Sequence, residues 1–264
     1  LGWLLPNLMT VAALSFGLTG LRFAFAGKWT EMLFMLVLAI LFDTLDGRVA
    51  RLFRSTSQFG AQLDSLSDAI VFGVVPAISL YLWGLQPANK IAWTATLFFC
   101  VCSVLRLARF NSNKGNVDHR FFQGLPCPAA AALVAGVVWV ITDFSVAGDA
   151  VIANDYLSWL VWVLVIYAGF CMVSVLPYYS FKDLKLRKSV PFLMVVMIAL
   201  GLVLVSQDPP LIIFITFVCY SFSGFFLYFY RRAKGFNPGF IDDENLFEDK
   251  ILDSDEHSNH TRGS

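Results

Sequence analysis

Four aspartates with the chemistry of a metal site lie within 26 residues, at the edges of long apolar runs: Asp43, Asp46, Asp64 and Asp68. Ionisable side chains in or beside a membrane span are costly, and by default they mark function. Carboxylates gathered in one place repel one another and therefore need cations. Oxygen ligands with no neighbouring His or Cys favour Mg²⁺ or Mn²⁺ over zinc. We predict a divalent-metal site formed by these four side chains.

The spacing places the aspartates on two helix faces, together with small residues. The first face has positions i, i+3, i+4 and i+7, and the second has i, i+4 and i+8: Asp43, Asp46, Gly47 and Ala50, then Gly60, Asp64 and Asp68. Two metal ions about 3.5–4 Å apart can clamp the attacking and leaving oxygens of a displacement at phosphorus. The small residues leave room for a base or ribose, and Arg51 suits a diphosphate. The alternative is a purely structural set of ion pairs with neighbouring arginines.

The composition indicates the elements that must position these residues. The chain has 264 residues, of which 58% are hydrophobic and 14% charged. Soluble chains carry roughly 25% charged residues. The mean hydropathy is +0.68, and the formal net charge is zero, which gives no electrostatic basis for nucleic-acid binding. We predict an all-α, polytopic integral membrane helical bundle.

A membrane span needs roughly 20 apolar residues, which gives about eight transmembrane helices, at 8–26, 30–47, 65–85, 91–110, 124–142, 157–177, 190–206 and 210–230. The first ten residues are expected to form a short interfacial segment broken at Pro6. Residues 1–230 would form one membrane domain. Residues 231–264 are polar and acidic and are expected to be a disordered cytoplasmic tail.

The basic residues alternate from one connection to the next. Lys and Arg gather in the connections 48–54, 106–120, 182–188 and 231–234. The connections between them hold only Lys28 and Lys90, with Arg22 near the end of the first span. The positive-inside rule therefore places both termini and the aspartates on the cytoplasmic side of the inner membrane.

The pattern D-x2-D-G-x2-A-R-x8-G-x3-D-x3-D runs without a gap from Asp43 to Asp68. It resembles the signature of the CDP-alcohol phosphatidyltransferases, integral membrane enzymes of phospholipid synthesis. The resemblance implies that the acids hold two metals, that the small residues admit CDP, and that Asp68 is the catalytic base. Members often begin with a similar Pro-Asn-x-x-Thr near the nucleotide site, which makes Asn7 a candidate nucleotide contact; a helix cap is the other reading.

Three residues at the end of the fourth span are candidates for binding the acceptor alcohol: Arg106, Arg109 and Asn111. The two arginines are three apart and share a helix face. The stretches 121–130 and 178–182 resemble those of bacterial-type phosphatidylserine synthases, a branch of the family, and the second includes Lys182 as a candidate phosphate contact. Paired arginines suit a carboxylate, which serine has and glycerol, inositol and choline lack. Pairing with anionic lipid head groups is the alternative.

The predicted reaction transfers the phosphatidyl group of CDP-diacylglycerol to the hydroxyl of L-serine and releases CMP. Glycerol 3-phosphate or an inositol phosphate is an alternative acceptor, and a homodimer is left open. A divalent-cation transporter is the alternative from another class. Against the transporter, the aspartates lie at a span edge rather than at the midplane, and the later spans have no matching acids.

Overall fold

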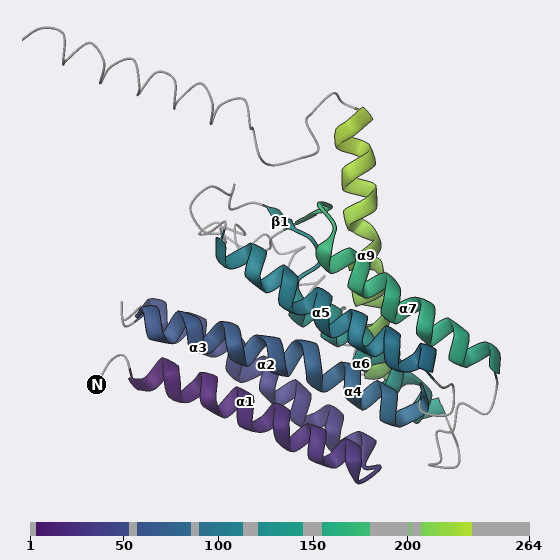
Figure 1. Cartoon of the computed structure of the whole chain (residues 1–264), viewed down its shortest axis with the longest axis horizontal. Coiled ribbons are helices and arrows are strands. Elements are labelled where there is room, and N and C mark those ends of the chain that lie inside the picture. The colour runs from purple at the N-terminus through teal and green to yellow at the C-terminus, as the bar shows by residue number, and fades with distance from the viewer. Residues whose placement is uncertain are drawn as a thin grey trace, which may run out of the picture.

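The computed structural model describes residues 4–52, 57–85, 90–112, 121–144, 155–179, 201 and 207–233. Its helices lie side by side as a bundle (Figure 1). They are α1 (Leu4–Phe25), α2 (Trp29–Leu52), α3 (Gln58–Asp68), α4 (Val75–Leu80), α5 (Lys90–Ser112), α6 (Cys127–Phe144), α7 (Asp155–Val173) and α9 (Pro209–Ala233). A π-helical segment, η1 (Ala69–Val74), joins α3 to α4, and a second, η2 (Tyr81–Leu85), continues α4, so that these segments form one continuous rod. Two short strands, β1 (Phe121–Gln123) and β2 (Pro177–Tyr179), pair antiparallel.

Seven of the eight predicted spans fall on these helices, and the span predicted at 190–206 lies outside the described residues. Within the described part, four segments are long and apolar enough to cross a membrane: Leu4–Phe25, Gln58–Gly84, Ala92–Ser112 and Pro209–Ala233. The chain is therefore a helical, multi-pass membrane protein. The number eight stays a prediction, as does the tail, because residues 234–264 are not described.

Two local predictions were wrong. The chain does not break at Pro6, because α1 begins at Leu4 and continues through it. Proline is tolerated in the first turn of a helix, where its missing N–H has no partner to lose. The predicted span 124–142 also began too early, and the predicted span 157–177 ended too late. α6 begins only at Cys127 and α7 ends at Val173, and the β1–β2 pair is formed by residues before α6 and after α7.

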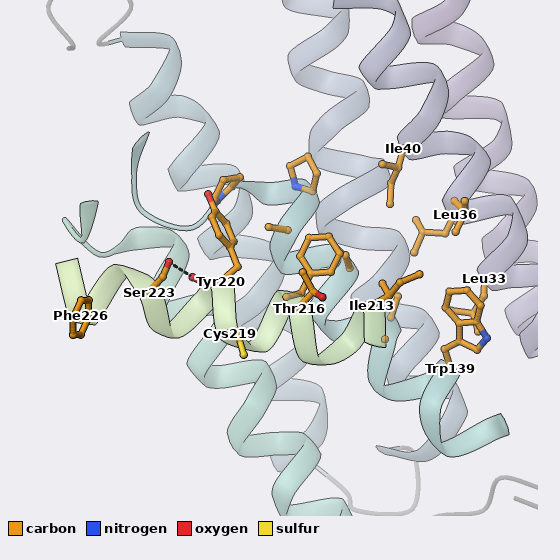
Figure 2. A pocket seen from close by; sticks show the side chains of 18 of the residues that line it. Leu33, Leu36, Ile40, Trp139, Ile213, Thr216, Cys219, Tyr220, Ser223 and Phe226 are labelled. Atoms are coloured by element: carbon orange, nitrogen blue, oxygen red, sulfur yellow. Dashed lines mark hydrogen bonds between the residues drawn. The ribbon is translucent and has the colours of Figure 1, made fainter. Parts of the chain in front are cut away.

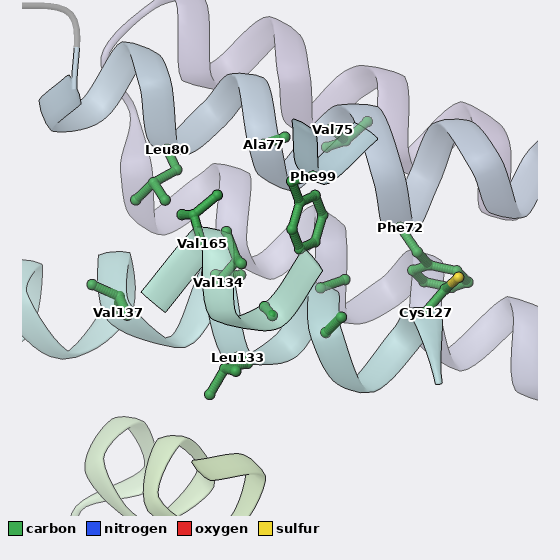
Figure 3. Packing of buried hydrophobic residues seen from close by; sticks show 14 of the residues in the cluster. Phe72, Val75, Ala77, Leu80, Phe99, Cys127, Leu133, Val134, Val137 and Val165 are labelled. Atoms are coloured by element: carbon green, nitrogen blue, oxygen red, sulfur yellow. The ribbon is translucent and has the colours of Figure 1, made fainter. Parts of the chain in front are cut away.

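The core lies between the α3–α4 rod, α5, α6 and α7. Phe72 and Phe99 are fully buried there, with Val134 and Val165 beside Phe99 (Figure 3). Small residues permit the close approach of helices that association in lipid requires. A Cβ on Gly73, for example, would lie 2.9 Å from Ser103 Oγ of α5. Large apolar side chains on the outside, such as Phe34, Val101 and Phe226, suit a surface bathed in hydrocarbon.

Candidate active site

The start of α3 sets the direction of the second acidic face. Ser57 precedes the helix with an extended backbone, and its hydroxyl accepts a 3.0 Å hydrogen bond from the Gly60 N–H. This N-cap satisfies one of the donors that every helix leaves unpaired at its start. With the first turn fixed, Gly60, Asp64 and Asp68 follow on one face of α3 at intervals of four residues.

The structure brings together three of the four predicted metal ligands. One carboxylate oxygen each from Asp43 of α2 and from Asp64 and Asp68 of α3 all lie within 4.8 Å of one another. The three residues are half-buried. The buried Oδ1 of Asp68 has no hydrogen-bond partner among the described residues. Clustered oxygen donors, one of them buried and unpaired, fit a hard divalent cation.

Asp46 is not part of the group of three within 4.8 Å. Its side chain is only 5% exposed, and its Oδ2 accepts a 2.7 Å hydrogen bond from Thr10 Oγ1 of α1. A charge-assisted bond of this length fixes the orientation of the carboxylate. Ser67 of α3 donates a longer bond, 3.5 Å, to the Thr10 carbonyl. Thr10 thus links α1 to both acidic helices.

The predicted nucleotide residues of α1 and α3 meet at one point. A Cβ on Gly60 would lie only 2.8 Å from Asn7 Oδ1, so glycine is what allows the two to approach. The buried Nδ2 of Asn7 has no partner in the part of the chain that is described, which leaves a donor for a ligand. Among the described residues, a Cβ on Gly47 would meet nothing within 4 Å, so the described part of the chain leaves space on this face of α2. The side chains of Ala50 and Arg51 lie outside the described set.

Arg106 is buried deeply for an arginine. It is 9% exposed, and its Nη1 donates to Cys127 Sγ at 3.2 Å. Its Nε is buried and, within the described residues, unpaired. A hydrogen bond to sulfur offsets the charge of a guanidinium poorly, and a buried charge without a counter-ion is expensive. The site around Arg106 therefore fits an anionic ligand. Cys127 was missed as a site residue because a thiol within an apolar run gives no signal of such a contact.

The other predicted acceptor residues have different surroundings. Arg109 Nη1 donates a 2.8 Å hydrogen bond to the Val173 carbonyl at the end of α7. Satisfying a terminal helix carbonyl in this way is a structural contribution. Asn111 Nδ2 donates to Ser65 Oγ at 2.9 Å, which connects the end of α5 to the acidic helix. Lys182 lies outside the described residues.

Comparison with known proteins tests the predicted family directly. The sequence model for CDP-alcohol phosphatidyltransferases matches residues 3–170, a stretch that runs from the start of α1 into α7. The chain belongs to this family. The matched region contains the four aspartates, Arg106 and Arg109. Family members generally use divalent metals, which agrees with the donor set at Asp43, Asp64 and Asp68.

The chain is similar to curated proteins from two bacteria and from yeast, each named CDP-diacylglycerol–serine O-phosphatidyltransferase. The protein of Mycobacterium leprae is 32% identical over 223 residues, which cover 82% of this chain and 72% of that protein. The protein of Helicobacter pylori strain 26695 is 33% identical over 213 residues, covering 80% and 86%. The protein of Saccharomyces cerevisiae is 37% identical over 131 residues, which cover 46% of this chain and 47% of the yeast protein.

Proposed function

We propose that the chain transfers the phosphatidyl group of CDP-diacylglycerol to the hydroxyl of L-serine and releases CMP. The observation that carries this proposal is the group of three carboxylates within 4.8 Å. The chain belongs to the CDP-alcohol phosphatidyltransferase family, and its relatives are named CDP-diacylglycerol–serine O-phosphatidyltransferase.

Asp43, Asp64 and Asp68, with Asp46 beside them, would hold Mg²⁺ or Mn²⁺, and two ions are expected. When bound, the metal supplies charge neutralisation and alignment for the diphosphate. Thr10 holds the Asp46 carboxylate in place. Asn7 and Gly60 border the space for the nucleotide. Gly47 and Ala50 are proposed to admit it, and Arg51 and Lys182 remain proposed phosphate contacts.

Asp68 is the proposed general base. Its Oδ1 is buried and, among the described residues, unpaired, as a base waiting for a proton should be. In the proposed step, the serine hydroxyl gives its proton to Asp68 while its oxygen bonds to the phosphorus on the lipid side. The bond from that phosphorus to the CMP oxygen breaks, and CMP leaves with the bonding electrons.

Arg106 is the proposed partner of the serine carboxylate. Its buried Nε has no partner among the described residues, whereas a guanidinium nitrogen of Arg109 is already bonded to the Val173 carbonyl. A fork-shaped guanidinium pairs with a planar carboxylate through two hydrogen bonds. The phosphate of glycerol 3-phosphate or of an inositol phosphate would also pair with a guanidinium, so the choice of serine over these acceptors rests on the name that the relatives carry.

The proposed location is the inner membrane, with the site facing the cytoplasm. The sequence alternation of basic connections supports this orientation, and Arg231 and Arg232 in the last turn of α9 agree with it. Serine and the nucleotide product are both water-soluble, so a site at the cytoplasmic edge would receive the one and release the other.

The test is CMP release by purified protein given CDP-diacylglycerol and one alcohol at a time: serine, glycerol 3-phosphate, inositol phosphate or none. We expect release with serine and formation of phosphatidylserine. An Asp64→Asn variant is the matched control, because it removes one carboxylate charge from the cluster at nearly constant volume. Preference for another alcohol would keep the family chemistry and refute the serine assignment.

A further inference from the structure

A cluster of buried polar side chains joins α5 to the start of α6. Cys127 is 1% exposed, and Ser103 is fully buried. Arg106 Nη1 donates to Cys127 Sγ at 3.2 Å, and Ser103 Oγ donates to the same sulfur at 3.5 Å. The thiol in turn donates to the Ser103 carbonyl at 3.9 Å. Ser103 and Arg106 are three residues apart and share a face of α5, so one sulfur atom contacts both side chains.

Ser103 is held in this contact from its other side by η1. A Cβ on Gly73 would lie 2.9 Å from Ser103 Oγ and 3.1 Å from Ser103 Cβ, so η1 and α5 approach each other closely here. Side chains in a closely packed interior keep one rotamer, because moving them would create a clash or a void. The Ser103 hydroxyl and the Cys127 thiol therefore hold each other in a fixed arrangement.

The Cys127 sulfur is directed at α5 rather than at the neighbouring cavity. Pro126 and Pro128, on either side of Cys127, line an apolar cavity between α2, α6 and α9. Figure 2 shows part of its wall, with Cys219 and Tyr220 of α9. The described lining includes both prolines and not Cys127. The hydrogen bonds given above for the sulfur all go to α5.

The contact with Cys127 determines which edge of the Arg106 guanidinium is left for a ligand. A guanidinium can hold a carboxylate through two hydrogen bonds at its end-on edge, Nη1 with Nη2, or at its side-on edge, Nε with Nη2. Cys127 occupies Nη1. Nε is buried and has no partner among the described residues. The side-on edge therefore remains for a ligand.

We propose that Cys127 is a positioning residue: it holds Nη1 of Arg106 and turns the edge with Nε and Nη2 toward the carboxylate of the acceptor, which binds side-on. The inference rests on the proposed function, because it takes the acceptor to be serine. It adds a residue that acts through Arg106 and does not itself touch the substrate.

Sulfur suits this task because it is a weak hydrogen-bond acceptor. It orients the guanidinium and leaves its positive charge available to the substrate. A carboxylate at the same place would form a strong ion pair with Arg106 and compete with the acceptor for it.

The first test removes the sulfur. Cys127→Ala takes away the acceptor for Nη1 without adding bulk, and it should raise the KM for serine about tenfold, the scale of one hydrogen bond to a charged group. The KM for CDP-diacylglycerol should change little. Cys127→Val fills nearly the same volume without an acceptor and should have the same effect, which excludes lost volume as the cause. Cys127→Ser keeps an acceptor and should recover most of the affinity for serine.

Cys102→Ala is the matched control. Cys102 is also a buried cysteine, 3% exposed, on the same helix as Arg106. Its sulfur lies toward α7, because a Cβ on Gly169 would be 3.5 Å from it. The control variant loses the same atom as Cys127→Ala at a similar depth, and its KM for serine should stay near the wild-type value.

The second test asks whether the effect passes through Arg106. In an Arg106→Lys background, Cys127→Ala should add little to the KM for serine, because lysine has no side-on edge to orient. Independent substitutions would instead multiply their effects on KM. Serinol lacks the carboxylate, so its use as an acceptor should be nearly the same in Cys127→Ala and in the wild type. The preference for serine over serinol should therefore fall in the variant.

The outcomes separate this inference from the function on which it rests. A lower melting temperature with an unchanged KM for serine, in Cys127→Ala or Cys127→Val, would mean that the contact only stabilises the fold and would overturn the inference. Multiplied effects in the double variant would also overturn it. Both results leave the proposed function intact if the wild type releases CMP with serine. Wild-type protein that releases no CMP with any alcohol would refute the proposed function itself.

Discussion

Replacing Arg106 with lysine tests the assignment of serine as the acceptor. Arg106→Lys keeps the positive charge in a buried position and removes the planar fork. The guanidinium has one buried nitrogen, Nε, without a partner in the described structure, and one, Nη1, bonded to Cys127 Sγ at 3.2 Å. A carboxylate ligand would satisfy the first of these nitrogens. The variant should therefore fold and still bind the serine carboxylate less well.

The magnitude follows from the loss of one charge-assisted hydrogen bond, about 1.5–3 kcal/mol. This corresponds to an increase of about 10- to 150-fold in the KM for serine. The KM for CDP-diacylglycerol should change little, because the proposed contacts of its phosphates lie elsewhere. Serinol, which lacks the carboxylate, should be a poor acceptor for the wild type and lose little further in the variant.

Arg109→Lys is the matched control, since it loses the bond to the Val173 carbonyl rather than a substrate contact. It should lower the melting temperature and leave the KM for serine near the wild-type value. The assay is CMP release at varied serine and fixed donor concentration. An unchanged KM for serine in Arg106→Lys, or serinol accepted as well as serine, would refute the assignment.

Four further predictions address the metal and nucleotide groups. EDTA should abolish CMP release, and Mg²⁺ or Mn²⁺ should restore it; activity in a rigorously metal-free preparation would contradict the metal site. Thr10→Val loses the 2.7 Å bond to Asp46 and should raise the Mg²⁺ concentration for half-maximal rate about tenfold or more, with recovery in Thr10→Ser. Gly60→Ala places a methyl group 2.8 Å from Asn7 Oδ1 and should raise the KM for CDP-diacylglycerol while the KM for serine stays near the wild-type value. Asp68→Asn should cut the rate about 10²–10⁴-fold and retain donor binding; parallel loss of binding would make Asp68 a ligand rather than the base.

The helices and the acidic faces could be predicted because they depend on short spacings. Hydrophobic length gave seven segments that fall on helices, and the i+4 interval of Asp64 and Asp68 placed both on one side of α3. The connections between the helices were harder to predict from the sequence. The spans predicted to start at 124 and end at 177 gave no sign of the β1–β2 pair, which depends on hydrogen bonds between segments more than 50 residues apart.

Contacts between residues far apart in the chain were the main feature that the sequence did not predict. The contact of Thr10 with Asp46 joins residues 36 apart, and that of Arg106 with Cys127 joins residues 21 apart. Neither follows from periodicity, because each depends on how two helices cross. The sequence therefore assigned Asp46 to the same group as the other acids and treated Arg106 and Arg109 as equivalent, whereas their surroundings differ. The assigned roles of all these residues stay predictions until the variants are measured.

The start of α6 carries the contact to the proposed acceptor arginine. Cys127 Sγ accepts the hydrogen bond from Arg106 Nη1. Its position is set by the β1–β2 pair and by Gly124, whose φ of 77° and close approach to the Met172 carbonyl favour glycine.

The same strand pair also contacts α9. Tyr178 of β2 is fully buried and donates a 3.0 Å hydrogen bond to the Ser221 carbonyl of α9, and Gly224 allows its ring to approach that helix closely. The β1–β2 pair therefore positions α6 and α9 relative to each other. Since α6 carries Cys127, which accepts the hydrogen bond from Arg106, the strand pair also helps to hold the proposed acceptor contact in place.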